Sequence, residues 1–289
     1  MKILITGGSG FLGSALRQAL PQHQWAVFSR QARPEAGWFN QLQQAVSWQP
    51  ELIINLAGES LFSHRWTAKR WQAIEESRIG LTQELFRLCQ QQPPKRLISG
   101  SAIGFYGEGG EQLLTEHSAA GSDQSSLLCQ QWEQAALQFR QLGTEVCCVR
   151  TGLVMSAKGG ALQPLLPLFK LGMGGPLGLG KHYWSWISLA DWLAAMRFLI
   201  EQPELKPAYN FTAPEPLQQK EFARILGQAL KRPSFLPTPS PALYLSMGAD
   251  RAKLLLCSQR VLPQALLEQG FRFQHPSWQL GVYSALARE

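Results

Sequence analysis

Hydrophobic positions come in short continuous runs along the first half of the chain, and helix-like segments separate these runs. Such runs are typical of parallel strands that are buried on both faces, because helices cover each side of the sheet. The predicted strands are residues 2–6, 25–29, 52–57, 96–99 and 145–150. The predicted helices are residues 11–20, 67–91 and 130–142. This alternation predicts an α/β fold, a Rossmann-like doubly wound parallel sheet.

The second half of the chain has a different pattern. Residues 159–180 are rich in Gly, Pro and Leu, which predicts a long irregular segment. Helical patterns return at 187–199, at 220–230 and in the tail from 242, with a short strand at 209–212. We expect residues 1–155 to form a nucleotide-binding domain, to which 186–212 return. Residues 156–289 are then a smaller, mostly helical substrate or lid domain over the carboxyl edge of the sheet.

Composition narrows the class of protein. The chain has 289 residues, of which 45% are hydrophobic and 16% charged, as in ordinary globular domains. No apolar run reaches about 18 residues, so we expect no membrane span. The N-terminus lacks a signal-peptide pattern, which predicts a cytoplasmic protein. The five cysteines are odd in number and show no C-x-x-C spacing, so they indicate reduced, buried thiols and neither a disulfide framework nor a metal site.

The net charge is +7, and basic residues gather in one segment that looks helical. Its basic and aromatic members are Arg65, Lys69, Arg70 and Arg78, with Trp66 and Trp71 between them. Such a segment can bind nucleic acid, form a solvated helix face, or face an anionic cofactor. No recognised nucleic-acid module accompanies it. We therefore expect a small-molecule substrate as partner, with no nucleic acid and no membrane, and the sequence leaves the oligomeric state open.

A glycine-rich loop follows the first predicted strand. In the segment TGGSGFLG, Gly7, Gly10 and Gly13 have the spacing G-x-x-G-x-x-G and stand between a strand and a helix, as a dinucleotide-binding loop requires. Gly7 permits a tight turn, Gly10 lets a pyrophosphate approach the backbone, and Gly13 lets helix and strand pack closely. The free amides and the dipole at the start of the helix favour phosphate groups. The loop predicts a dinucleotide cofactor.

The end of the second predicted strand indicates which dinucleotide binds. An acidic residue there would bind a ribose 2′-hydroxyl and indicate NAD. The sequence is FSRQAR, without an acid. Arg30 can hold a 2′-phosphate through its planar guanidinium and Ser29 can donate a hydrogen bond to it. We therefore predict NADP(H).

Several motifs resemble those of a known superfamily. TGGSGFLG, LIINLAG and ISGSAIGFYG resemble the extended short-chain dehydrogenases/reductases, which include the nucleotide-sugar epimerases. NLAGES, VRTGLVMSAKGGAL, LFKLGMGGPLGLGKHYWSWI and SQRVLPQALLEQGFRF resemble the "epimerase family" of atypical members, which has its own C-terminal domain. The resemblance spans essentially the whole chain. It implies a nucleotide-binding fold and a family-specific tail at about 240–287.

The resemblance also implies which residues bind the cofactor. They come from the glycine loop, the ends of neighbouring strands, and the Glu-Ser-Arg run that ends at Arg78. The expected set is Gly7, Gly8, Ser9, Gly10, Phe11, Leu12, Gly13, Ser29, Arg30, Leu56, Ala57, Gly58, Arg78, Ser99, Gly100 and Val154.

The usual catalytic pair of this superfamily is missing. Short-chain dehydrogenases use a Tyr in Y-x-x-x-K, whose pKa the Lys lowers, together with a Ser that orients the substrate oxygen. The Ser is retained as Ser101, but Leu128 stands at the Tyr position and Trp132 at the Lys position. Neither can transfer a proton, and the resemblance implies that the family shares this loss.

Another group would then have to act as acid or base. The candidates near the carboxyl edge of the sheet are Ser101, Tyr106 and Glu59, followed by Glu108, Lys181, His182 and Tyr183. Related sequences tend to have W-I-H-x-x-D where this chain has Ser188 in place of the His and retains Asp191. We expect Asp191 to cap the helix that it begins.

Two functions agree with these observations. In the first, the protein is an NADP(H)-dependent oxidoreductase or epimerase-like enzyme, with residues 172–180 closing over a pocket less polar than a nucleotide sugar would favour. In the second, it is a catalytically silent NADP(H)-binding sensor or regulatory protein, which the missing Tyr and Lys favour.

Overall fold

A seven-stranded parallel sheet organises the first part of the chain in the computed structural model, which describes residues 1–31 and 33–287. Its strand order is β12-β7-β5-β4-β1-β2-β3. The strands are β1 (Lys2–Thr6), β2 (Gln24–Phe28), β3 (Trp38–Phe39), β4 (Leu52–Asn55), β5 (Arg96–Ala102), β7 (Glu145–Thr151) and β12 (Ala208–Phe211). The predicted Rossmann-like fold is therefore confirmed, and β12 brings a late segment back to the edge of this sheet.

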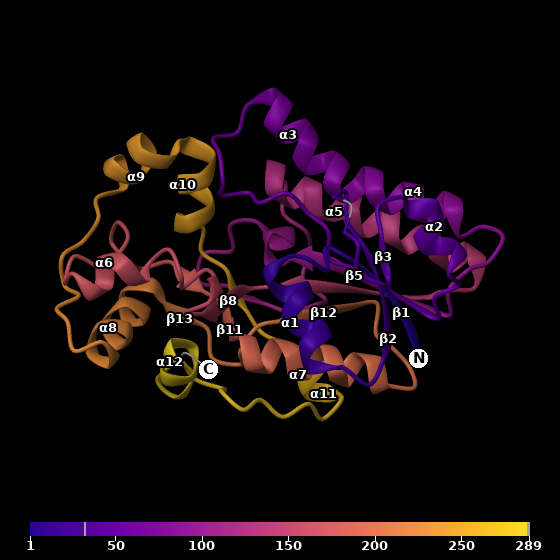
Figure 1. Cartoon of the computed structure of the whole chain (residues 1–289). Helices are drawn as coiled ribbons and strands as arrows, with labels where there is room; N and C mark the ends of the chain where they lie inside the picture. The colour runs from indigo at the N-terminus through magenta and orange to yellow at the C-terminus, as the bar shows by residue number, and fades with distance from the viewer. Residues whose placement is uncertain (32, 288–289) are drawn as a thin grey trace.

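Helices cover both faces of the sheet (Figure 1). On one face lie α1 (Phe11–Ala19), α7 (Leu189–Glu201) and α11 (Gln264–Glu268), and on the other α2 (Leu42–Ser47), α3 (Ala68–Glu75), α4 (Leu81–Leu88) and α5 (Gln124–Leu137). Alternate residues of β1 enter two different cores, with Ile3 and Ile5 in one and Leu4 in the other. Two buried faces explain why this strand is apolar at every position from 3 to 5.

The C-terminal part lies beside the sheet, on the left in Figure 1. It contains β8 (Leu153–Ser156), β9 (Gly159–Gly160), β10 (Tyr183–Trp184), β11 (Trp186–Ser188), β13 (Leu217–Gln218), α6 (Leu166–Lys170), α8 (Gln219–Ala229), α9 (Ser240–Met247), α10 (Ala249–Leu256) and α12 (Trp278–Leu286). A separate pair, β6 (Leu113–Leu114) and β14 (Arg260–Val261), joins the two parts. Phe222 stacks on Trp278 at 4.4 Å between ring centroids and packs against Trp184, so this part has its own core.

Four elements differ from the sequence prediction. Helix α5 begins at Gln124 and not at 130, because Asp123 caps it by accepting hydrogen bonds from the amides of Ser125 and Ser126. The predicted helix 67–91 is divided by a π-helical segment at Glu76–Gly80. Strand β3 and helix α2 were not predicted, because the Gln-rich stretch that contains them has a weak hydrophobic pattern.

The glycine-rich segment 159–180 is not a free lid. It contains β9 and α6, and its residues Leu166, Phe169 and Leu177 are buried in the core of the C-terminal part. A Cβ at Gly180 would lie 2.7 Å from the Cβ of Lys220 at the start of α8, so backbone and helix are in close contact. From 172 to 180 the glycines serve packing between C-terminal elements, whereas Gly159 packs against the Phe11 ring of α1.

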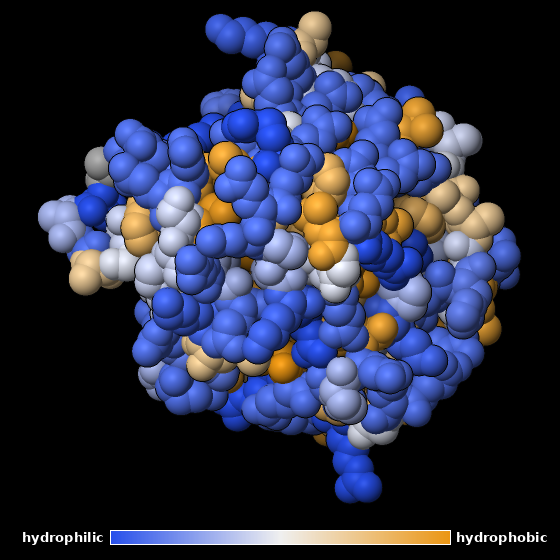
Figure 2. Space-filling model, turned by 90° about the vertical axis from the view of Figure 1, so that its right-hand side faces the viewer, coloured by the Kyte–Doolittle hydropathy of each residue, from blue (hydrophilic) through white to orange (hydrophobic). Residues whose placement is uncertain are grey.

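The surface at the sheet end of the molecule is mainly hydrophilic. Figure 2 views this end and shows hydrophobic side chains in separate small patches among polar ones. Of the helices in the described residues, none has the length and apolar character needed to cross a bilayer.

Ser188, and not Asp191, caps helix α7. The Ser188 hydroxyl accepts a hydrogen bond from the Asp191 amide at 3.0 Å. The Asp191 carboxylate, fully buried, accepts hydrogen bonds from the amides of Gln274 and His275 at 2.7 and 3.0 Å. The expectation that Asp191 is the cap is wrong: Ser188, three residues earlier, is the cap, and the Asp191 side chain accepts from the Ser188 hydroxyl at 2.8 Å and holds the chain that leads to α12.

We expect Asp191→Ala to lower the free energy of unfolding by about 2–3 kcal/mol, because the amides of Gln274 and His275 lose their buried acceptor. Ser188→Ala removes a helix cap and should cost about 1 kcal/mol. Urea unfolding followed by circular dichroism measures both. Glu201→Ala, at an exposed position of the same helix, is the control. Equal losses in Asp191→Ala and Glu201→Ala would contradict this role.

Candidate cofactor and catalytic site

Two adjoining cavities lie at the carboxyl ends of the central strands. The outer cavity, about 1110 Å³, lies beside the end of β2. The inner cavity, about 470 Å³, lies beside the ends of β5 and β7. Both are lined by Gly7, Gly10, Leu56 and Gly58. The shared residues make one continuous groove across the sheet edge, at the position where open α/β sheets bind ligands.

The glycine loop forms the floor where the two cavities meet. Gly7 has a φ of +71°, in the left-handed region, and its carbonyl accepts a hydrogen bond from the Gly10 amide at 3.0 Å. A Cβ on Gly13 would overlap the Gly7 carbonyl, so α1 packs closely on the loop. A Cβ on Gly10 would have one neighbour, the Gly7 carbonyl at 3.2 Å, and it would fill space at the mouth of both cavities.

This arrangement fits a dinucleotide. Gly10 stands directly before α1, whose first-turn amides have no acceptor within the helix. The missing side chain at Gly10 leaves those amides open to an anion, as a pyrophosphate requires.

Most of the predicted cofactor residues line this groove. Around the outer cavity lie Gly7, Ser9, Gly10, Ser29, Arg30, Leu56, Ala57 and Gly58. Around the inner cavity lie Phe11, Leu12, Gly13, Arg78 and Gly100, besides the four shared residues. Within the described chain, Gly8, Ser99 and Val154 line neither cavity: a Cβ on Gly8 would meet Ile5 and Val27, and the other two are buried. Their contact with a cofactor stays a prediction.

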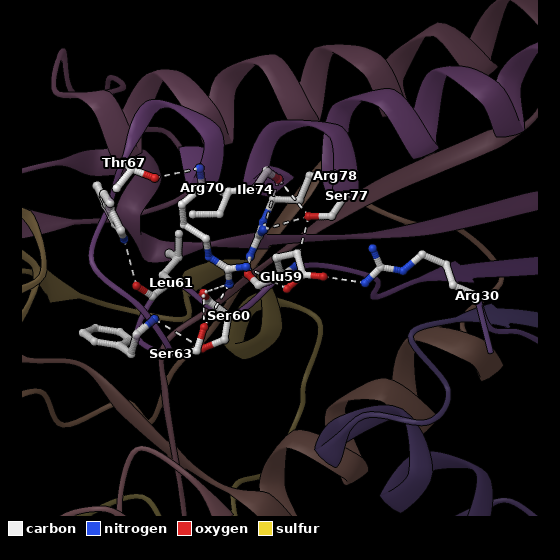
Figure 3. Close-up of polar contacts among 12 residues, drawn as sticks. Arg30, Glu59, Ser60, Leu61, Ser63, Thr67, Arg70, Ile74, Ser77 and Arg78 are labelled. Carbon is white, nitrogen blue, oxygen red and sulfur yellow. Dashed lines mark hydrogen bonds and ion pairs between the residues drawn. The ribbon is translucent and has the colours of Figure 1, made fainter. Parts of the chain in front are cut away.

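Glu59 directly follows Gly58, which lines both cavities, and lies between two arginines (Figure 3). Its carboxylate forms ion pairs with Arg30 and with Arg70, the latter at 3.1 Å. Its amide donates to the Ser77 hydroxyl and its carbonyl accepts from Arg78, each at 3.0 Å. Hydrogen bonds from Arg30 and then Arg70 hold the pKa of this carboxyl below its usual value. The structure therefore keeps Glu59 ionised and does not bring it to Ser101 at the inner cavity.

Arg78 reaches the groove from the π-helical segment, a kind of irregularity that is common at functional sites. Its guanidinium lies 5.3 Å from the centre of the Trp132 ring. Burial lowers its pKa from the ordinary value. A Cβ on Gly58 would lie 2.9 Å from the guanidinium carbon, so glycine is needed there to admit the arginine. Two basic residues of the predicted helix, Arg70 and Arg78, therefore bind protein groups beside the groove.

The usual acid–base pair is replaced by apolar walls. Leu128 and Trp132 line the inner cavity, and both are buried. The Trp132 indole nitrogen finds no hydrogen-bond partner among the described residues. A phenol and an ammonium group are therefore absent from the positions where this fold usually supplies them.

Ser101 lies at the inner cavity and rests on a buried ion pair. Its hydroxyl donates to the Glu133 carboxylate at 2.7 Å. The same carboxylate accepts hydrogen bonds from Nε and Nη2 of Arg150, both at 2.8 Å. Burial opposes the charge of Arg150, but the hydrogen bonds to Glu133 raise its pKa above the ordinary value. This pair was not among the residues predicted from the sequence, although opposite charges within two apolar elements were a signal for it.

Tyr106 lies beneath the inner cavity and not in its wall. Its hydroxyl donates to Asn210 at 2.7 Å and accepts from Arg150 at 2.9 Å. Burial raises its pKa to about 12. The proposed acid–base role of Tyr106 is therefore not favoured by the geometry. Among the further candidates, Tyr183 lines the inner cavity, whereas burial lowers the pKa of His182, which lines neither cavity.

The C-terminal part covers the inner cavity with a different segment from the one expected. Its covering residues are Tyr183, Trp184, Ser185, Leu254, Leu255, Cys257 and Gln259. Residues 172–180 line neither the inner nor the outer cavity. The expected glycine-rich lid is thus replaced by α10 and the chain that follows it.

A third cavity of about 430 Å³ adjoins the inner one through Ser125, Leu254 and Cys257. Its charged lining consists of Glu108, Asp123, Asp250 and Lys253. Three carboxylates face one ammonium group there, so this end of the site has a net negative character.

The sheet, the glycine loop and the groove define a dinucleotide-binding protein of the extended short-chain dehydrogenase/reductase type. The profile of the NAD dependent epimerase/dehydratase family matches residues 3–211, and this chain belongs to that family. A domain of unknown function, DUF1731, matches residues 238–280. The resemblance seen in the sequence is confirmed.

Relatives cover nearly the whole chain. It is 35% identical to the epimerase family protein Mb2239 of Mycobacterium bovis, over 94% of this chain and 93% of that protein. It is 34% identical to the epimerase family protein YfhF of Bacillus subtilis, over 99% and 98%. The crystal structure of the human epimerase family protein SDR39U1 with NADPH matches with a TM-score of 0.91 at 30% identity, covering 99% of both chains.

Glu133→Ala should lower the free energy of unfolding by about 3–5 kcal/mol, because the buried guanidinium of Arg150 loses its partner. Glu133→Gln keeps hydrogen-bond acceptors and should cost less. Chemical denaturation measures both, with exposed Glu204→Ala as the control. If Glu133→Ala were no more destabilising than the control, the ion pair would not support the site.

Proposed function

We propose that this protein binds NADP(H) and acts as an oxidoreductase or epimerase-like enzyme on a small carbonyl or hydroxyl compound. The preference for NADP(H) rests on the position of Arg30, whose side chain lines the outer cavity and is 77% exposed. Ser29 lines the same cavity directly before it. An arginine there attracts a 2′-phosphate, which an acid would repel. The NADPH in the structure of the human relative supports this preference.

The inner cavity supplies the second part of the proposal. A nicotinamide cofactor supplies or accepts a hydride when it is bound. Ser101 donates its hydroxyl hydrogen to Glu133, which leaves the serine lone pairs available to a hydroxyl group in the cavity. Its neighbours Leu128 and Trp132 exclude water from this region. In this proposal Ser101 orients the substrate oxygen, and Tyr183 is the tyrosine in position to exchange a proton.

The same walls indicate the class of substrate. Apolar side chains dominate the inner cavity, and three carboxylates stand at the cavity beside it. A nucleotide-sugar diphosphate would be repelled by those carboxylates. We therefore favour a small, uncharged and largely apolar substrate.

A specific observation also favours a second function. Leu128 and Trp132 remove the usual proton-transfer pair and leave the cofactor groove intact. A protein that binds NADP(H) as a sensor, without turnover, would have this arrangement.

Arg30→Ala should weaken NADPH binding about tenfold or more and leave NADH binding nearly unchanged, because one charged hydrogen-bonding partner of the 2′-phosphate is lost. Quenching of tryptophan fluorescence during titration measures both affinities. Arg33→Ala is the matched control, since the Arg33 guanidinium lies 4.4 Å from the centre of the Trp38 ring. Equal affinities for NADH and NADPH in the wild type would refute the preference.

Turnover separates the two functions. NADP⁺ reduction with a panel of uncharged primary and secondary alcohols should identify a substrate, because the Ser101 oxygen can accept from a substrate hydroxyl, and Ser101→Ala should slow that reaction about tenfold or more at unchanged NADPH affinity. The absence of turnover across the panel, with tight NADPH binding, would favour the sensor.

A further inference from the structure

The ion pair between Arg30 and Glu59 links a residue that lines the outer cavity to the residue that directly follows Gly58 of the same lining. Arg30 follows β2 and Glu59 follows β4, and these strands flank β1 and its glycine loop. Figure 3 shows the Arg30 side chain extended toward Glu59, with Arg70 on the opposite side of the carboxylate. The residue that is expected to hold a 2′-phosphate thus already holds a carboxylate of the protein.

We propose that Glu59 is a specificity-determining residue, whose carboxylate competes with the 2′-phosphate of NADP(H) for Arg30. This inference rests on the NADP(H) site proposed above. It assigns Glu59 a role in cofactor selection and not in proton transfer.

The three partners differ in their freedom to move. Arg70 is 16% exposed and donates to the Ser60 carbonyl and the Ser63 hydroxyl at 2.7 and 2.9 Å. The main chain of Glu59 is held on both sides, by Ser77 and by Arg78. Arg30, 77% exposed, lacks such anchors among the described residues. Arg30 is therefore the partner that can turn to a phosphate, while Arg70 keeps the Glu59 carboxylate paired.

The chemistry of the ligands sets the direction of the competition. A phosphate monoester carries more negative charge than a carboxylate and offers three acceptor oxygens, so it attracts the guanidinium more strongly. A ribose 2′-hydroxyl carries no charge, so NAD(H) leaves the Arg30–Glu59 pair in place. Because an exposed ion pair contributes little free energy, the competition should alter NADP(H) affinity by a small factor.

Glu59→Gln tests the competition, because glutamine keeps the size and removes the charge. We expect it to tighten binding of NADPH and of 2′,5′-ADP about two- to fivefold, with NADH and 5′-AMP unchanged. Glu84→Gln is the matched control, since Glu84 lines the same cavity and forms no ion pair within the described chain. Isothermal titration calorimetry on the full chain measures all four ligands.

The same substitution in an Arg30→Ala background identifies the mechanism. If Glu59 acts by competing for Arg30, the gain in NADPH affinity disappears there. A gain that persists in full, or an NADPH affinity that Glu59→Gln leaves unchanged or weakens, overturns the inference. If the wild-type protein fails to bind both NADPH and 2′,5′-ADP, the proposed function itself is wrong. The two failures therefore give different results.

Discussion

The buried ion pair between Glu133 and Arg150 supports the whole inner site. Glu133 lies on α5 and Arg150 on β7, and their hydrogen bonds reach Ser101 on β5 and the hydroxyl of Tyr106. Through Asn210 the network continues to β12 and the Leu262 carbonyl. A buried charge is tolerated where every partner is in place, so this network fixes the relative positions of strands that are far apart in sequence.

That constraint changes the chemistry expected at this fold. At the positions where this superfamily has its Tyr and Lys, the inner cavity presents the apolar side chains of Leu128 and Trp132, near Ser101, whose hydroxyl is directed by a buried carboxylate. The cation that lines the inner cavity is not a lysine on α5 but Arg78, which comes from a π-helical segment and lies 5.3 Å from the centre of the Trp132 ring. The cofactor groove is thus retained without the Tyr and Lys at their usual positions.

The loop after Glu59 connects the predicted cofactor groove with the segment that covers the inner cavity. The loop after Glu59 runs from Arg30 and Arg70 to α9 and α10. Arg65 of this loop donates to the Leu245 carbonyl of α9 at 2.9 Å, and Arg251 of α10 donates to the Phe62 carbonyl of the loop at 2.8 Å. α10 in turn covers the inner cavity. One loop therefore contacts the predicted phosphate site, the groove and its cover, which gives the N-terminal and C-terminal parts a common element at the site.

The sequence by itself determined the sheet, the glycine loop and the loss of the Tyr and Lys, because each depends on local spacing: a buried strand is apolar at every position, and a tight turn needs glycine at Gly7. Only the tertiary structure decided the features that depend on long-range contacts. It turned Tyr106 beneath the cavity, moved the cover from 172–180 to α10, and placed Glu59 between Arg30 and Arg70. The partners of these side chains lie on strands and helices that are far apart in sequence. The positions of the side chains therefore depend on how the elements pack and cannot be predicted from the local sequence pattern.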